Sequence, residues 1–225
     1  MSGTGQGTGT GTDADAGTGT DHAVRTDRVV TKGTFSLDGD TFDVDNNVWL
    51  IGDDEEVLIV DAPHDARAIL DAVAGRHVTA IACTHAHDDH VDAAAELSRL
   101  TGAPVLLHPG DHELWSHTHP ARKPDGELTD GRILTVAGIE VQVIHTPGHT
   151  WGSCSFYAPF LNTVFTGDTL FHGGPGATGR SYSDRPTIEA SLRDRLLTLP
   201  GDTVVRTGHG QDTTIAAERP NVPAL

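Results

Sequence analysis

Residues 78–90 read VTAIACTHAHDDH, an apolar run followed at once by three histidines and two aspartates. The apolar part has the length of a buried strand, and His85 and His87 then project from the same side of an extended backbone. Two imidazoles placed in this way can bind one cation. Asp89 and His90 come next, where we expect the chain to turn into a helix, and they can reach a second cation nearby. This stretch therefore predicts a metal site after a strand.

Three further candidate ligands each follow a glycine at the end of an expected strand. They are His149, Asp168 and His209. Strand ends that open into glycine-rich loops commonly carry functional groups. The combined set has histidine and aspartate but no cysteine, which suits zinc, manganese or iron in an open site rather than a closed structural zinc site. Two divalent ions about 3.5–4 Å apart can hold a hydroxide between them and polarise a carbonyl group.

The remaining pattern predicts an α+β protein, because strands lead and helices then alternate with strands. The expected strands are 34–37, 41–44, 47–51, 57–60, 78–83, 104–107, 133–136, 139–144, 153–157, 163–166 and 203–206. The expected helices are 65–74, 92–100 and 187–197. This order favours two sheets with helices outside them.

Composition limits the possible partners and the compartment. The 225 residues carry 15 basic and 32 acidic side chains, a net charge of −17, so nucleic acid and anionic membranes are not expected partners. Residues 1–22 are mostly Gly, Thr, Asp and Ala, and we expect a disordered tail there and one domain over residues 23–225. Cys83 and Cys154 lie in apolar runs and are expected to be buried thiols. With no signal peptide or membrane span evident, a cytoplasmic location is expected.

The motifs resemble those of the metallo-β-lactamase superfamily, and most closely its glyoxalase II-like branch. The matching segments are His85-x-His87-x-Asp89-His90, Thr-Pro-Gly-His149-Thr, Thr-Gly-Asp168-Thr-Leu-Phe and Gly-His209-Gly, with Asp61 as the supporting residue of the first motif. The resemblance implies an αββα sandwich of two mixed β-sheets flanked by helices, with the site along one edge of the sheets.

The same resemblance implies how the ligands are shared. One metal would take His85, His87 and His149, the other would take Asp89, His90 and His209, and Asp168 would bridge them. The cofactors would be two divalent metal ions, with zinc as the first expectation and iron as the alternative. The implied reaction is hydrolysis of a thioester of a low-molecular-weight thiol by a metal-bridging hydroxide, with Asp89 and Asp168 as the catalytic residues.

Several alternatives stay open. A persulfide dioxygenase would use a single iron held by the residues that match His85, His149 and Asp168, and a lactonase or other ester hydrolase is a weaker alternative. Asp168 stands where one large class of β-lactamases has cysteine, which counts against that activity. Arg180, in the loop after Asp168, either binds an anionic group of the substrate or pairs with Asp184. The chain ends 16 residues after His209, without the helical domain that grips glutathione in glyoxalase II, so the thiol and the acyl group stay open, as does the oligomeric state.

Overall fold

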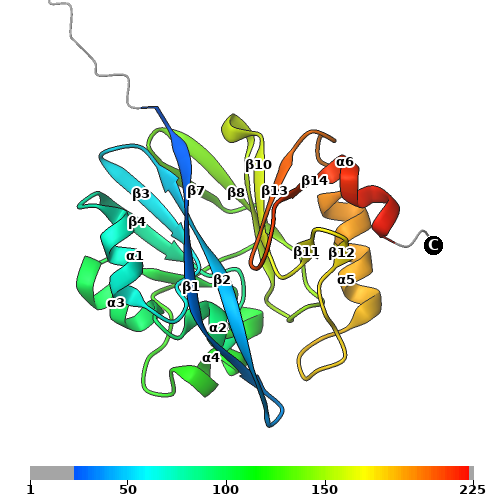
Figure 1. Cartoon of the computed structure of the whole chain (residues 1–225), viewed down its shortest axis with the longest axis horizontal. Helices are drawn as coiled ribbons and strands as arrows, with labels where there is room; N and C mark the ends of the chain where they lie inside the picture. The colour runs from blue at the N-terminus through cyan, green and yellow to red at the C-terminus, as the bar shows by residue number, and fades with distance from the viewer. Residues whose placement is uncertain (1–22, 223–225) are drawn as a thin grey trace, which may run out of the picture.

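The structure is a computed structural model that describes residues 23–222. These residues form two six-stranded mixed sheets packed face to face, with helices on both outer faces (Figure 1). The expected αββα sandwich is therefore confirmed. The expected disordered tail, residues 1–22, lies outside the described residues. Within the described part, no helix combines the length and the hydropathy needed to cross a membrane.

The first sheet has the strand order β1-β2-β3-β4-β5-β6. Its strands are β1 Arg25–Leu37, β2 Asp40–Gly52, β3 Glu56–Val60, β4 His77–Ala82, β5 Val105–Leu107 and β6 Gly126–Glu127. The first three strands are antiparallel and the last three run parallel to β3. The long β1–β2 hairpin extends beyond the sheet at the bottom of Figure 1.

The second sheet has the order β14-β13-β10-β9-β8-β7. Its strands are β7 Ile133–Val136, β8 Ile139–His145, β9 Cys154–Ala158, β10 Thr163–Gly167, β13 Val204–Thr207 and β14 Thr213–Thr214. Only β10 and β13 are parallel to each other. A small antiparallel pair, β11 Leu170–Phe171 with β12 Gly174–Pro175, lies beside this sheet.

Helices cover the two outer faces of the sandwich. They are α1 Ala66–Val73, α2 Asp88–Val91, α3 Ala94–Thr101, α4 His112–Thr118, α5 Arg185–Ser191 and α6 Ile215–Glu218. Asp65 caps α1 by accepting hydrogen bonds from the backbone N–H groups of Arg67 and Ala68, and Asp184 caps α5 in the same way through Thr187. A five-residue π-helical turn, Leu192–Leu196, extends α5.

Strand alternation explains how both faces of a sheet are buried. Along β2, Trp49 and Ile51 pack between the two sheets, whereas Val48 and Leu50 pack under α1 and α3. Because both faces of the sheet are covered, the sequences at the ends of the central strands are continuously apolar and do not alternate between apolar and polar residues. Cys83 and Cys154 are buried free thiols, as expected.

Four of the expected elements need correction. The strand expected at 34–37 is the end of β1, which begins at Arg25. Residues 41–44 and 47–51 belong to one strand, β2, because its full pairing with β1 carries the polar residues between them through the sheet. The helix expected at 92–100 begins earlier, as α2 at Asp88, and is interrupted before α3. Helices α4 and α6 were not expected, since their short sequences show no clear apolar stripe.

Candidate metal centre

All seven candidate ligands come together where the ends of the two sheets meet. His85 and His87 lie in the loop after β4, and Asp89 and His90 lie on α2 rather than before a helix. The second sheet supplies His149 after β8, Asp168 after β10 and His209 after β13. The cluster thus depends on both sheets.

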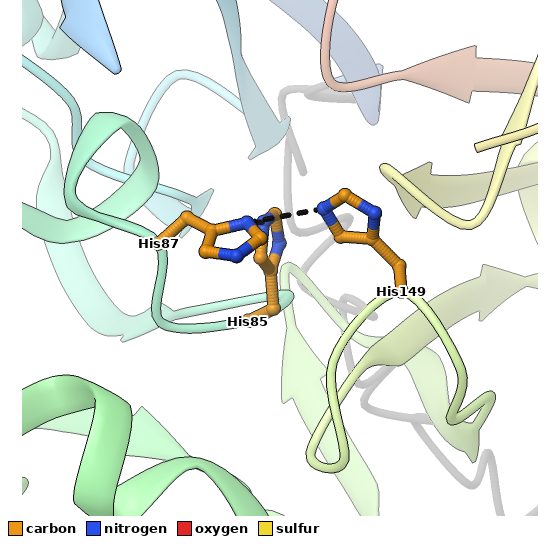
Figure 2. Close-up of side chains that lie close together, drawn as sticks. All are labelled: His85, His87 and His149. Carbon is orange, nitrogen blue, oxygen red and sulfur yellow. Dashed lines mark hydrogen bonds between the residues drawn. The ribbon is translucent and has the colours of Figure 1, made fainter. Parts of the chain in front are cut away.

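Three histidines form the first part of the cluster, which we call the three-histidine group. His85 Nε2 lies 3.0 Å from His87 Nδ1, and His149 Nε2 lies 3.1 Å from the same atom. Figure 2 shows the three rings turned toward one another, with His149 approaching from the opposite sheet. Nitrogens about 2.0–2.1 Å from a tetrahedral zinc are about 3.3 Å apart. The spacing therefore suits a shared metal ion.

Asp89, His90 and His209 form the second part, which we call the mixed group. Nε2 of His209 lies 3.3 Å from Asp89 Oδ2 and 3.3 Å from His90 Nε2. Asp168 lies between the two groups: Oδ1 is 3.3 Å from His90 Nε2, and Oδ2 is 3.4 Å from His209 Nε2 and 3.7 Å from His149 Nε2. This is the position that a carboxylate shared by two metal ions would occupy.

Glycines before the ligands permit this close approach. A side chain at Gly208 would place its Cβ 2.3 Å from Asp168 Oδ1, and one at Gly148 would place it 2.2 Å from the backbone nitrogen of Ile188. Gly148 also has a φ of 129°, which other residues rarely adopt. The glycines that mark these motifs are therefore required by the packing of the ligand loops.

Four of the histidines have their second ring nitrogen held by another group of the protein, whereas His87 Nε2 is buried and has no hydrogen-bond partner among the described residues. His90 Nδ1 donates to Asp61 Oδ2 at 2.8 Å, and His85 Nδ1 donates to Thr84 Oγ1, which itself donates to Asp61. Asp61 thus orients one histidine of each group. His149 Nδ1 donates to the carbonyl of residue 177 and His209 Nδ1 to that of residue 45. Such contacts fix the tautomer and the direction of metal-binding histidines.

One observation that does not depend on the motifs indicates that these side chains suit divalent metal ions. Within residues 23–222, Asp168 Oδ1 is buried and has no hydrogen-bond partner, although His90 Nε2 lies 3.3 Å away. An unmet buried carboxylate oxygen is costly, and a cation would satisfy it. The ligand atoms of each group also lie within 4.8 Å of one another.

The protonation of the two groups differs. Burial and neighbouring imidazoles lower the pKa of His85 well below its usual value and that of His87 to about 3. Burial also opposes the protonation of His90 and His209, but nearby carboxylates outweigh it. They raise the pKa of His90 well above its usual value and that of His209 to about 10. In turn, these imidazoles overcome the effect of burial and lower the pKa of both Asp89 and Asp168.

Two further residues support the cluster and were not predicted. Asp111 is buried and accepts hydrogen bonds from the backbone N–H of Ala86 (3.0 Å), the hydroxyl of Thr150 (2.7 Å) and the backbone N–H of Gly152 (2.6 Å). It therefore ties the loop of His85 and His87 to that of His149. Burial raises the pKa of Asp111, although these donors oppose the shift.

Asn46 has the corresponding position in the mixed group. Its amide donates to the backbone carbonyl of Asp89 at 2.6 Å and to Asp89 Oδ2 at 3.1 Å, and its oxygen lies 2.9 Å from His64 Nε2. No sequence signal separates Asn46 or Asp111 from other polar residues, because their role depends on contacts across the fold.

A cavity of about 100 Å³ opens beside the three-histidine group. His87 and His149 line its inner end, and Phe35, Thr178 and Arg180 lie on its walls. Arg180 does not pair with Asp184, which caps α5. Its Nη1 lies 3.1 Å from Asp40 Oδ2 on the β1–β2 hairpin.

A four-layer sandwich with a histidine and aspartate cluster at the shared edge of its sheets defines a metal-dependent hydrolase. The family model of the Metallo-beta-lactamase superfamily matches residues 41–209, and the chain belongs to that superfamily.

Relatives within the superfamily differ in the activity and the metal that their names state. GloC of Haemophilus influenzae, a hydroxyacylglutathione hydrolase, is 31% identical over 80% of this chain and 92% of its own. The protein TTHA1623, solved in a di-iron-bound form, is 32% identical, with a TM-score of 0.70 over 86% of this chain and 99% of that one. BLEG-1, a B3 metallo-beta-lactamase, is 30% identical, with a TM-score of 0.73 over 86% and 98%.

Proposed function

We propose that this protein hydrolyses a thioester of a low-molecular-weight thiol, using two divalent metal ions. The observation that carries the proposal is the convergence of two three-ligand groups on the shared carboxylate of Asp168. The three-histidine group would hold one ion, the mixed group the other, and Asp168 both. Two such ions would polarise the carbonyl group and acidify water near neutral pH. The similarity to a hydroxyacylglutathione hydrolase supports the thioester as the substrate class.

The chain's own residues leave water as the nucleophile. Burial raises the pKa of both thiols, Cys83 and Cys154, so neither supplies a thiolate. Water adds to the thioester carbonyl carbon, the carbon–sulfur bond breaks, and the products are a carboxylic acid and a free thiol. Asp89, held by Asn46 at the edge of the cluster, would act as a metal ligand and orient the attacking hydroxide.

The cavity beside His87 and His149 would hold the acyl group. Phe35 packs edge-on against the His87 ring at 5.0 Å, so the wall next to the reacting carbonyl is apolar. An apolar wall excludes competing water and strengthens the electrostatic contacts inside the site. The small volume suits a short acyl chain, with the thiol carrier lying outside it.

Two substrates test the proposal against the dioxygenase alternative. S-lactoylglutathione and glutathione persulfide are supplied separately to anaerobically purified, metal-analysed protein, and free thiol and dissolved oxygen are followed. Thiol release without oxygen uptake, at close to two equivalents of metal, supports hydrolysis. The hydrolase proposal would be wrong if the protein contained one iron and consumed oxygen stoichiometrically with the persulfide, and if His85→Ala abolished this oxygen uptake. A cephalosporin serves as a third substrate, because a B3 β-lactamase is among the similar structures.

A further inference from the structure

Three adjoining cavities form the approach to the donor cluster. Besides the cavity of about 100 Å³, one of about 240 Å³ lies against His87, and one of about 350 Å³ lies beyond the hairpin tip, residues 36–41. The first and third share Ser181, and the second and third share Ser36 and Leu37. A carrier thiol attached to an acyl group beside His87 would lie along these walls if it leaves the first cavity through its neighbours.

The fixed charges on these walls are predominantly negative. Apart from the histidines, the ionised side chains that line the three cavities are the carboxylates of Asp38, Asp40 and Asp88 and the guanidinium of Arg180. The other lining groups next to the cluster are uncharged, including the hydroxyls of Thr178, Ser181 and Ser183.

Arg180, the one arginine or lysine that lines these cavities among the described residues, already contacts the hairpin. Nη1 of Arg180 lies 3.1 Å from Asp40 Oδ2 and donates to the carbonyl of Leu37 at 3.3 Å, and its guanidinium lies 5.1 Å from the centre of the Phe42 ring. The neighbouring backbone N–H of Ser181 donates to Asp38 Oδ2 at 3.0 Å. Arg180 Nη1 and the Ser181 N–H thus both contact carboxylates, which offset the positive charge that an anionic substrate group would meet here.

We propose that the carrier thiol of the substrate bears no net negative charge, and that the acidic walls select against carboxylate-bearing thiols such as glutathione. This inference rests on the proposed thioesterase function. A carrier carboxylate would face the carboxylates of Asp38 and Asp88 and the ion pair of Asp40 with Arg180, a net charge of −2. The net charge of −17 would also slow the encounter with any anion.

A matched pair of substrates tests this directly. S-lactoylglutathione has a net charge of −1, and its diamide, in which both carboxylates are carboxamides, has nearly the same size and a charge of +1. Interactions between exposed charges are individually weak. We therefore expect kcat/KM to be only about 10-fold higher for the diamide than for S-lactoylglutathione at low ionic strength. The difference should narrow in about 0.5 M NaCl, since salt screens exposed charges.

Variants of the hairpin test whether its carboxylates cause the difference between the two substrates. Asp38→Asn and Asp40→Asn should each raise kcat/KM for S-lactoylglutathione about 3-fold and leave the diamide nearly unchanged. Asp202→Asn is the matched control, because it removes one carboxylate from the turn before β13, at the strand end away from His209. It should change neither rate.

The outcomes separate this inference from the proposed function. The charge selection is wrong if S-lactoylglutathione is hydrolysed at least as fast as the diamide and its rate is unchanged in Asp38→Asn and Asp40→Asn. That result would still support the thioesterase function. When neither thioester is cleaved, the thioesterase proposal fails. Calorimetry with S-hexylglutathione and its diamide then compares binding alone, and tighter binding of the anionic thioether overturns the charge selection as well.

Discussion

The three-histidine group and the mixed group both contain histidines, but the pKa shifts of these histidines run in opposite directions. In the first, burial and neighbouring imidazoles lower the pKa of His85 and His87, so neutral rings present free lone pairs. In the second, the carboxylates of Asp168 and Asp89 raise the pKa of His90 and His209, so the metal-free protein contains internal ion pairs. The first group is prepared for a metal ion, whereas in the second the metal ion must replace protons.

The largest expected effect comes from removing the carboxylate that the two groups share. Asp168→Ala should lower the metal content at both positions and reduce turnover at least about 100-fold, because even outer contacts of metal ligands are worth about 10–100-fold. Asp89→Ala should release the metal of the mixed group only. Elemental analysis after dialysis measures both, and two retained metal ions in Asp168→Ala would show that the carboxylate does not bridge.

Lowering the pH should affect metal binding differently at the two groups. At pH 7 the raised pKa values mean that His90 and His209 are protonated in the metal-free protein, while His87, with a pKa of about 3, is not. Metal binding to the mixed group should therefore release about two protons and weaken about 100-fold for each unit by which the pH falls. At the three-histidine group the lowered pKa values of His85 and His87 mean that these two ligands release no protons on binding metal at neutral pH. Calorimetry in buffers of different ionisation enthalpy counts the protons, and equal release from both groups would contradict the comparison.

Asp111→Asn should weaken the three-histidine group selectively. The amide NH₂ of asparagine cannot accept from all three donors that Asp111 now satisfies, so the two ligand loops lose a common anchor. We expect a loss of about 10–100-fold in metal affinity at that group. Chelator competition and the absorption spectrum of the cobalt(II) form measure it. Glu140→Gln, an exposed change on β8, is the control, and an unaltered spectrum in Asp111→Asn would disprove the anchoring role.

The smallest effects should come from the contacts behind Asp89. Asn46→Ala removes the amide that holds Asp89, and we expect at most about 10-fold weaker metal binding at the mixed group. His64→Ala removes the contacts of the imidazole to Asn46 and to Asp92, neither of which is a direct contact to Asp89, and should have a smaller effect. Metal titration of both variants tests this order, which would be reversed if His64 itself contributed to the metal site.

The main elements of the fold followed from local patterns, and the exceptions have physical causes. Buried strands such as Val57–Val60 were predictable because covered strands read as apolar runs, and α1 was predictable from its cap, Asp65, and its apolar spacing. The continuity of β2 through Asp45 and Asn46 was not, because these polar residues are held in the strand by pairing with β1. Helix α2 was placed too late for a similar reason, since it is a single turn within the ligand motif.

The candidate ligands could be identified from sequence because each motif places metal-binding side chains at a strand end, and in the motifs of His149, Asp168 and His209 a glycine precedes the ligand. Close approach of the loops requires the glycine, and metal chemistry limits the donors to a few residue types. Local sequence therefore carries both kinds of information.

Tertiary structure decided what surrounds those ligands. The sequence did not indicate that Asp111 joins two ligand loops, that Asn46 holds Asp89, or that Arg180 pairs with Asp40. These contacts connect residues 39, 43 and 140 positions apart, respectively. A polar side chain looks the same in sequence whether it faces water or a distant loop, and only the packing of the two sheets brings its partner within reach.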